Sequence, residues 1–190
     1  YPVDSGILDR YKDAGDTPTF VLPITSSMTT LAWSGIDFID GWERAGQRDE
    51  LEAALRFHAD WCMAAHPEPD VFCGQIGQGG PSHAFWGPPE IHETATGYQP
   101  KIWWLNESNP GSEPAGEAAA FLAAMSMFTF QSDPGYAAKC LDHARDLYSF
   151  ANEHRGTYVD SIPDVVPFYN SWSGYMDELA WAASWLHRAT

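Results

Sequence analysis

The segment from Pro114 to Gln131 is rich in alanine and almost uniformly apolar. A helix that is apolar on every side must be surrounded by other parts of the protein. The sequence therefore predicts a buried helix here, inside a scaffold of other helices.

Four further helices are indicated by apolar side chains spaced three and four residues apart or by capping signals. They are expected over residues 26–44, 50–65, 134–155 and 176–188. Asp133 followed by Pro134 marks one start, because Asp caps a helix and Pro is tolerated at the first helical position. The last helix should bury one face, made of Leu179, Ala180, Ala183 and Leu186. No convincing pair of strands is evident, so we predict an all-α fold.

Two irregular stretches, residues 66–112 and 155–171, separate these helices. The first is rich in Pro, Gly, Asn and Trp and is far longer than a structural connection needs. Long loops on a helical scaffold are typical of proteins that carry a functional site on those loops. We expect a single domain over residues 1–190.

The chain is strongly acidic, with 26 Asp and Glu against 10 Lys and Arg and a formal net charge of −16. Such a surface repels nucleic-acid phosphates and anionic membranes, so neither is an expected partner. A neutral polysaccharide is compatible with it. Aromatic residues make up 14% of the chain, and flat rings serve both as core and as platforms for sugar rings. Composition does not decide between those two uses.

Two carboxylates, Asp13 and Asp16, stand on either side of Ala14 and Gly15 just before the first helix. Small residues between them let the chain turn tightly, so both acids can face one cavity. A pair of this kind suits proton transfer, because close like charges raise one of the two pKa values. Asp and Gly are also common in turns for local reasons, so the pair alone does not assign catalysis.

His83 and Trp86 lie three residues apart in a loop, which offers a hydrogen-bond donor beside a stacking surface. A Trp packed under the loop, with a solvated His, is the structural alternative. Further on, Ser173, Gly174, Asp177 and Glu178 cluster hard oxygen donors of the kind that Ca²⁺ prefers. The alternative there is a helix start, with Ser173 as cap and acids in the first turn.

Six segments occur together, in this order, in one family, and they span most of the chain. They include all of these positions except Asp177 and Glu178, which follow the last segment. They are Tyr11-Lys12-Asp13-Ala14-Gly15-Asp16, His66-Pro67-Glu68-Pro69-Asp70-Val71, His83-Ala84-Phe85-Trp86-Gly87-Pro88-Pro89-Glu90, Ser108-Asn109-Pro110-Gly111-Ser112, Ala115-Gly116-Glu117 and Tyr169-Asn170-Ser171-Trp172-Ser173-Gly174-Tyr175. In these segments the sequence resembles glycoside hydrolase family 9, the endoglucanases.

The resemblance implies an (α/α)6 barrel that hydrolyses β-1,4-glucan with inversion and uses no organic cofactor. Asp16 then resembles the catalytic base, and Asp13 its partner in holding the water. The glucan-binding residues implied are His83, Trp86, Tyr169 and Trp172.

The resemblance also implies structural Ca²⁺ at Ser173, Gly174, Asp177 and Glu178. Some members bind zinc through Cys and His. Here Cys62 and Cys73 stand near His58, His66 and His83, but their spacing matches no pattern that we can assign, so we do not predict zinc. The three cysteines, the third being Cys140, allow at most one disulfide.

Two departures from the family pattern matter. Thr17 follows Asp16, where the family usually has His, so contacts near the base are expected to differ. Family catalytic domains are also about twice as long, and their general acid is a Glu in a later motif.

One hypothesis is therefore that residues 1–190 are the N-terminal portion of an endoglucanase domain, an incomplete barrel prone to self-association. The other is a β-glucan-binding protein without the acid. If an acid within the chain has replaced the missing Glu, Glu117 and Glu178 are the first to check. Secretion is expected only because cellulose lies outside the cell.

Overall fold

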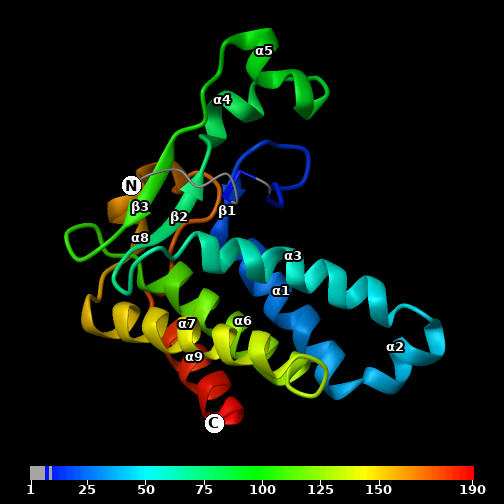
Figure 1. The fold of residues 1–190 in the computed structure, drawn as a ribbon. Helices are drawn as coiled ribbons and strands as arrows, with labels where there is room; N and C mark the ends of the chain where they lie inside the picture. The colour runs from blue at the N-terminus through cyan, green and yellow to red at the C-terminus, as the bar shows by residue number, and fades with distance from the viewer. Residues whose placement is uncertain (1–6, 9) are drawn as a thin grey trace.

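The computed structural model describes residues 7, 8 and 10–190. The elements in chain order are β1 (Thr19–Phe20), α1 (Val21–Asp37), α2 (Ile39–Ala45), α3 (Arg48–Ala64), β2 (Phe72–Ile76), α4 (Gly79–His83), η2 (Pro89–Ile91), α5 (His92–Thr96), β3 (Ile102–Leu105), α6 (Ser112–Thr129), α7 (Pro134–Glu153), α8 (Tyr158–Ser161), η3 (Pro163–Val165) and α9 (Met176–Ala189). The long helices lie together, the sheet with α4 and α5 extends from one side of them, and α2 lies at the opposite end of α1 and α3 (Figure 1).

Helix α6 is the centre of the protein, and every residue from 112 to 126 is buried. It packs against α1, α7 and α9. Glycine allows one of these close approaches, because a Cβ atom at Gly116 would lie 3.2 Å from the Glu178 carbonyl oxygen of α9. The prediction of a helix buried on all sides is confirmed.

The helix predicted over 26–44 is two helices, and it begins earlier than expected. Helix α1 starts at Val21 and includes Pro23 in its first turn, where a missing N–H costs no helical hydrogen bond. The break falls at Phe38, whose backbone leaves the helical region with φ −126° and ψ 31°. No proline or glycine stands at residue 38, so no breaker residue marks this boundary.

A three-stranded antiparallel sheet in the order β1-β2-β3 contradicts the expectation that the chain has no strand pair. All five residues of β2 are buried, so the strand lacks the apolar–polar alternation that would identify it. Its partner β3 is contributed from the far end of the long irregular stretch. Sheet formation therefore depends on contacts between segments that are distant in sequence.

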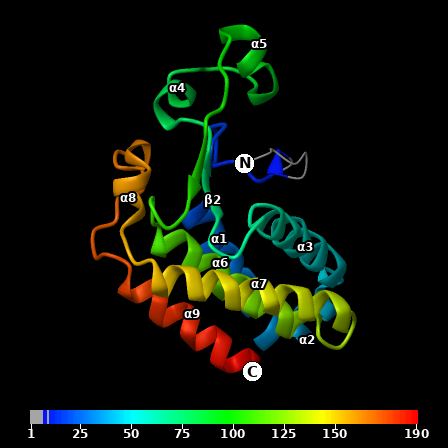
Figure 2. The ribbon, with the colours of Figure 1, turned by 60° about the vertical axis from the view of Figure 1, so that its left-hand side comes forward.

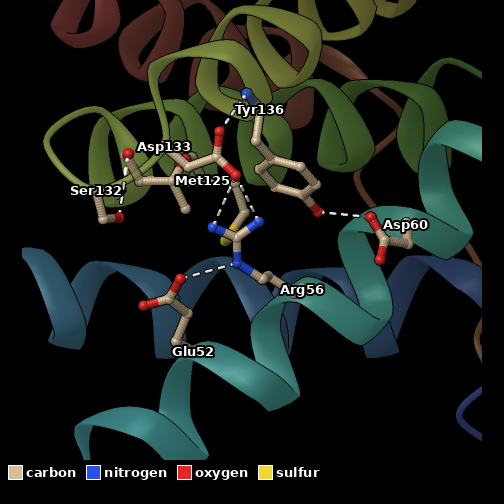
Figure 3. Close-up of polar contacts among 8 residues, drawn as sticks. Glu52, Arg56, Asp60, Met125, Ser132, Asp133 and Tyr136 are labelled. Carbon is tan, nitrogen blue, oxygen red and sulfur yellow. Dashed lines mark hydrogen bonds and ion pairs between the residues drawn. The ribbon is translucent and has the colours of Figure 1, made fainter.

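Helices α3 and α7 begin and end close to their predicted bounds, and polar side chains link them (Figure 3). Arg56 of α3 pairs with Glu52 at 2.8 Å and with Asp133 at 3.4 Å, and its guanidinium lies 4.2 Å from the centre of the Tyr136 ring. The Tyr136 hydroxyl donates to Asp60 at 2.8 Å. As predicted, Asp133 also caps α7, because it accepts from the Tyr136 N–H at 3.0 Å.

The buried face of α9 is made of Leu179, Ala182 and Trp185. Ala180 is exposed, and the predicted face is therefore wrong in part. Alanine is small enough for either side of a helix, whereas the large Trp185 side chain is buried and packs edge-on against Trp33 of α1. No helix among the described residues is both long and apolar enough to cross a membrane.

Figure 2 shows the short helices α4 and α5 extending beyond the sheet, on the side opposite the C-terminal end of α9. The loop before β1 lies at the same end of the molecule as the sheet (Figure 1). The irregular segments that carry the candidate residues thus gather at one end of the helical scaffold.

Candidate active site

Asp13 and Asp16 lie at the two ends of a tight turn. The Asp16 N–H donates to the Asp13 carbonyl at 2.8 Å, and the Asp13 N–H donates to the Pro18 carbonyl at 2.9 Å. Ala14 has a φ of 45°, in the left-handed region that residues other than glycine seldom occupy. The backbone then enters β1, whose pairing with β2 anchors this turn to the sheet.

The Asp13 carboxylate is held by Tyr169, a residue of the distant loop before α9. The Tyr169 hydroxyl donates to both carboxylate oxygens, at 2.8 and 3.0 Å. Partial burial and the hydrogen bond to Asp13 raise the pKa of Tyr169 to about 12. The hydroxyl therefore remains a donor across the pH range in which proteins are usually active.

Asp16 meets two residues of α4. The Ser82 hydroxyl donates to one carboxylate oxygen at 3.4 Å, and His83 Nδ1 lies 3.3 Å from the other. Ser82 is buried, whereas the His83 side chain is 76% exposed. Three segments far apart in the sequence thus bring Asp13, Asp16, His83 and Tyr169 together.

Asp164 fixes the segment that leads into α4. Its carboxylate accepts from the Gln75 side chain at 2.7 Å and from the Gly79 N–H at 2.8 Å. Glycine is required at residue 79, because a Cβ atom there would lie 2.2 Å from the Phe168 ring. Sequence reasoning missed Asp164 and Ser82, since neither belongs to a pattern that indicates its partner.

Trp86 and Trp172 are almost fully exposed to solvent, with exposed fractions of 101% and 89%. The alternative in which Trp86 packs under its loop is therefore wrong. Single exposed aromatic side chains are normal on protein surfaces, so the exposure of these two residues does not by itself assign a ligand to them.

Glu113 is a buried acid that sequence reasoning also missed. Its carboxylate accepts from the Tyr158 N–H at 2.9 Å and from the Ser171 hydroxyl at 2.7 Å. Burial raises its pKa. The Tyr158 hydroxyl in turn donates to the Tyr169 carbonyl, so Glu113 helps to fix the loop that carries Tyr169 and Trp172. No sequence pattern marked Glu113, because it stands one residue before the predicted helix over 114–131.

Glu117 and Glu178, the two alternative acids, both lie where α6 meets α9. Burial raises the pKa of Glu117 to about 7 and that of Glu178 to about 8. Each has one buried carboxyl oxygen, Oε2, without a hydrogen-bond partner. Glu117 bonds with Trp181 of α9, which places it in the interface between two helices rather than on the turn of Asp13 and Asp16.

The predicted calcium ligands form one compact segment at the start of α9. The Ser173 hydroxyl donates to Asp177 at 3.1 Å, and the carboxyls of Asp177 and Glu178 hydrogen-bond with each other. That bond is the largest cause of the lowered pKa of Asp177. Gly174 has a φ of 78°, which glycine adopts without strain.

The cysteines lie in the core. All three are free and buried, and burial raises the pKa of Cys73 to about 12, so its thiol stays protonated. His58 hydrogen-bonds to Thr25 at 3.0 Å, and His66 to His143 at 2.8 Å. In the described part of the chain, no group of three or more His, Cys, Asp and Glu side chains is arranged to hold a metal ion.

Comparison with known proteins gives a consistent result. A family model described as glycosyl hydrolase family 9 matches residues 9–190. The chain is 42% identical over 187 residues to an endoglucanase of Dictyostelium discoideum, and 43% identical over 181 residues to endoglucanase 13 of Arabidopsis thaliana. These alignments cover 98% and 95% of this chain, but only 26% and 36% of those proteins.

Solved structures agree with the sequence comparison. An endoglucanase from the termite Nasutitermes takasagoensis superposes with a TM-score of 0.89 at 44% identity, over 95% of this chain and 40% of that one. A cellulase of C. cellulolyticum in complex with cellobiose superposes with a TM-score of 0.84 at 32% identity, over the same shares. These neighbours are (α/α)6 barrels, and the present chain has the fold of part of such a barrel.

Proposed function

Because this chain belongs to glycosyl hydrolase family 9, we propose that it forms the N-terminal part of an endoglucanase domain that hydrolyses β-1,4-glucan with inversion. One observation carries the proposal: Asp13 and Asp16 stand on one turn, and each is held by a side chain from a different distant segment. The relatives' printed names support the substrate class, since they are endoglucanases and cellulases.

The contacts of the two carboxylates support different roles for them. Tyr169 binds both oxygens of Asp13 at short distance, so Asp13 is positioned to hold a water molecule rather than to take its proton. Asp16 accepts only the two longer contacts, at 3.3 and 3.4 Å, and keeps lone pairs free for a water proton. Asp16 is therefore the proposed base, and Asp13 its partner.

Inversion needs a second group on the opposite side of the scissile bond, at roughly 6.5–9.5 Å from the base, to protonate the leaving oxygen. We assign this acid to a part of the domain outside these residues, because the chain spans only 26% of the Dictyostelium relative. The exposed faces of Trp86 and Trp172 offer stacking surfaces for glucose rings, with His83 as a donor beside them.

The test uses the complete domain that contains these residues, because the proposed acid lies outside them. It measures reducing-sugar release from carboxymethyl cellulose and follows the anomeric form of the first product by ¹H NMR. Release of the α-anomer is the expected result. Release of the β-anomer would overturn the inverting assignment. Binding to cellulose without any release would favour the second candidate, a glucan-binding chain that lacks the acid.

We also propose a structural Ca²⁺ at Ser173, Gly174, Asp177 and Glu178. The donor set supports it, because two carboxylates, a hydroxyl and backbone carbonyls suit this cation. A divalent cation would also supply a partner for the buried Oε2 of Glu178. Bound calcium would rigidify the start of α9 and the loop that carries Tyr169 and Trp172.

Calcium binding is expected to release a proton at pH 7, because Glu178 has a pKa of about 8 and must ionise to bind the cation. Calorimetry in two buffers of different ionisation enthalpy measures this release, and the melting temperature should fall on chelation. Glu178→Gln should abolish both effects, whereas the exposed Glu107→Gln should keep them. An unchanged melting temperature after chelation of the wild-type protein would contradict the site.

Secretion and self-association remain proposals that follow from the same function. Cellulose lies outside cells, so an enzyme that acts on it must be exported. Partial barrels leave apolar side chains uncovered, and Phe38 and Phe130 are 68% and 62% exposed here. The molecular mass in solution tests whether copies of the chain cover these surfaces.

A further inference from the structure

His92 lies behind Asp16, in the lobe formed by α4, η2 and α5. Its side chain is 1% exposed and is stacked between two aromatic rings, with centroids 4.6 Å away at Phe85 and 4.3 Å away at Tyr98. The planes are nearly parallel, at 16° and 14°. The two rings therefore fix the position and plane of the imidazole.

A continuous run of hydrogen bonds leads from this ring to Asp16. His92 Nδ1 lies 3.1 Å from the Thr17 hydroxyl, and the Thr17 hydroxyl lies 3.0 Å from the Ser82 hydroxyl. Ser82 lies 3.4 Å from Asp16 Oδ1 and also accepts from the Thr17 N–H at 2.8 Å.

The Asp16 carboxylate at the end of this run determines which group donates in every hydrogen bond. A carboxylate oxygen only accepts, so the Ser82 hydroxyl donates its hydrogen to Asp16. Ser82 must then accept from the Thr17 hydroxyl, which has no hydrogen left for His92. His92 therefore donates from Nδ1, and the three donors all point toward the carboxylate.

We propose that His92 is a positioning residue for Asp16, acting through Thr17 and Ser82. The run fixes Oδ1 of Asp16 and leaves Oδ2, beside His83, to face the reacting water. Thr17 completes the run, so the residue that follows the second Asp is part of the site. The proposal rests on the proposed role of Asp16 as base.

The test uses two deletions, one rescue, one control and one reference variant, Ser82→Ala, which removes the hydroxyl that contacts Asp16. His92→Phe keeps a ring between Phe85 and Tyr98 but removes the donor, and Thr17→Val removes the middle hydroxyl. His92→Asn restores a donor where Nδ1 stood. The matched control is His58→Phe, because His58 is equally buried, bonds to a threonine hydroxyl at 3.0 Å and stacks on Trp61, but has no link to Asp16.

Two readouts are measured on each variant, made in the complete domain that also contains the proposed acid. In both deletions kcat on cellotetraose should fall roughly ten- to a hundredfold with KM nearly unchanged, because a misplaced base slows chemistry more than binding. The ¹³C signal of the Asp16 carboxyl at constant pH should move as well. His92→Asn should restore both toward wild type, and His58→Phe should leave both unchanged once the folded fraction is taken into account.

The carboxyl signal does not depend on turnover, so it separates this inference from the proposed function. If no variant and no wild-type protein hydrolyses glucan, the proposed function fails, and the NMR signal still decides whether His92 reaches Asp16. A signal that moves in Ser82→Ala but stays unchanged in both His92→Phe and Thr17→Val would overturn the inference.

Discussion

In the complete domain, Asp16→Asn is expected to lower kcat for glucan hydrolysis by roughly 10²–10⁴-fold, the usual contribution of a general base. The amide has nearly the same shape as the carboxylate and can still accept from Ser82, so the turn and the α4 contacts should survive. It cannot take a proton from water. Loss of rate without loss of fold is therefore the expected result.

The affinity for substrate and the rate of hydrolysis must be measured separately to interpret this variant. Calorimetry with cellotetraose should give an affinity close to that of the wild type, and initial rates on the same sugar should show the loss. Asp142→Asn, on the exposed side of α7, makes the same chemical change away from the site and should keep full activity. A tenth or more of the wild-type rate in Asp16→Asn would contradict its role as base.

The second large effect concerns stability and pH. Glu117 has a folded-state pKa of about 7, above its ordinary value of 4.5. The folded protein therefore binds this proton more tightly than the unfolded chain. The resulting stability is fully present below pH 4.5 and is lost as the pH rises to about 7. A rise of this size corresponds to about 3 kcal/mol in the free energy of unfolding.

Glu117→Gln should remove this loss, because a glutamine stays neutral at every pH. The free energy of unfolding is measured in urea at pH 5 and at pH 8. Its decrease from pH 5 to pH 8 should be smaller in this variant than in the wild type. Glu107→Gln, on the surface, should leave the wild-type difference unchanged. Equal losses in Glu117→Gln and the wild type would show that Glu117 is not the cause. Measurements should be made with a chelator, since a cation at Glu178 would change that neighbouring carboxyl.

His58 has the opposite effect on how the stability of the fold depends on pH. Burial lowers its pKa from 6.5 to about 3, so the folded protein resists protonation of this ring. The stability that depends on neutral His58 is present above pH 6.5 and is lost as the pH falls toward 3. Together, these two buried groups favour greatest stability in mildly acidic solution.

Local patterns in the sequence were sufficient for most of the helices. The uniformly apolar run of α6 and the Asp133 cap of α7 each depend on neighbouring residues alone, and the structure bears both out. The sheet was missed because β2 is buried on both faces and pairs with strands far away in the chain. The buried face of α9 was predicted only in part, because tertiary packing decides which alanines are covered.

In the candidate site, too, features that depend on neighbouring residues could be predicted, and contacts between distant segments could not. Asp13 and Asp16 could be selected from the sequence because they are neighbours on one turn. Their contacts with Tyr169 and Ser82 could not be predicted, because a hydrogen bond between distant segments leaves no mark on either segment. The run through Thr17 to His92 was invisible for the same reason, although the unusual threonine after Asp16 marked its location.

The positive φ of Ala14 limits how this turn can be transplanted. A left-handed conformation costs an alanine roughly 1–2 kcal/mol, so a short peptide with the sequence of residues 12–17 would adopt other shapes. The hydrogen bond from Asp13 to Pro18 and the contacts with α4 and Tyr169 maintain this conformation. A designer who grafts the two carboxylates onto another scaffold must therefore move these supporting segments with them.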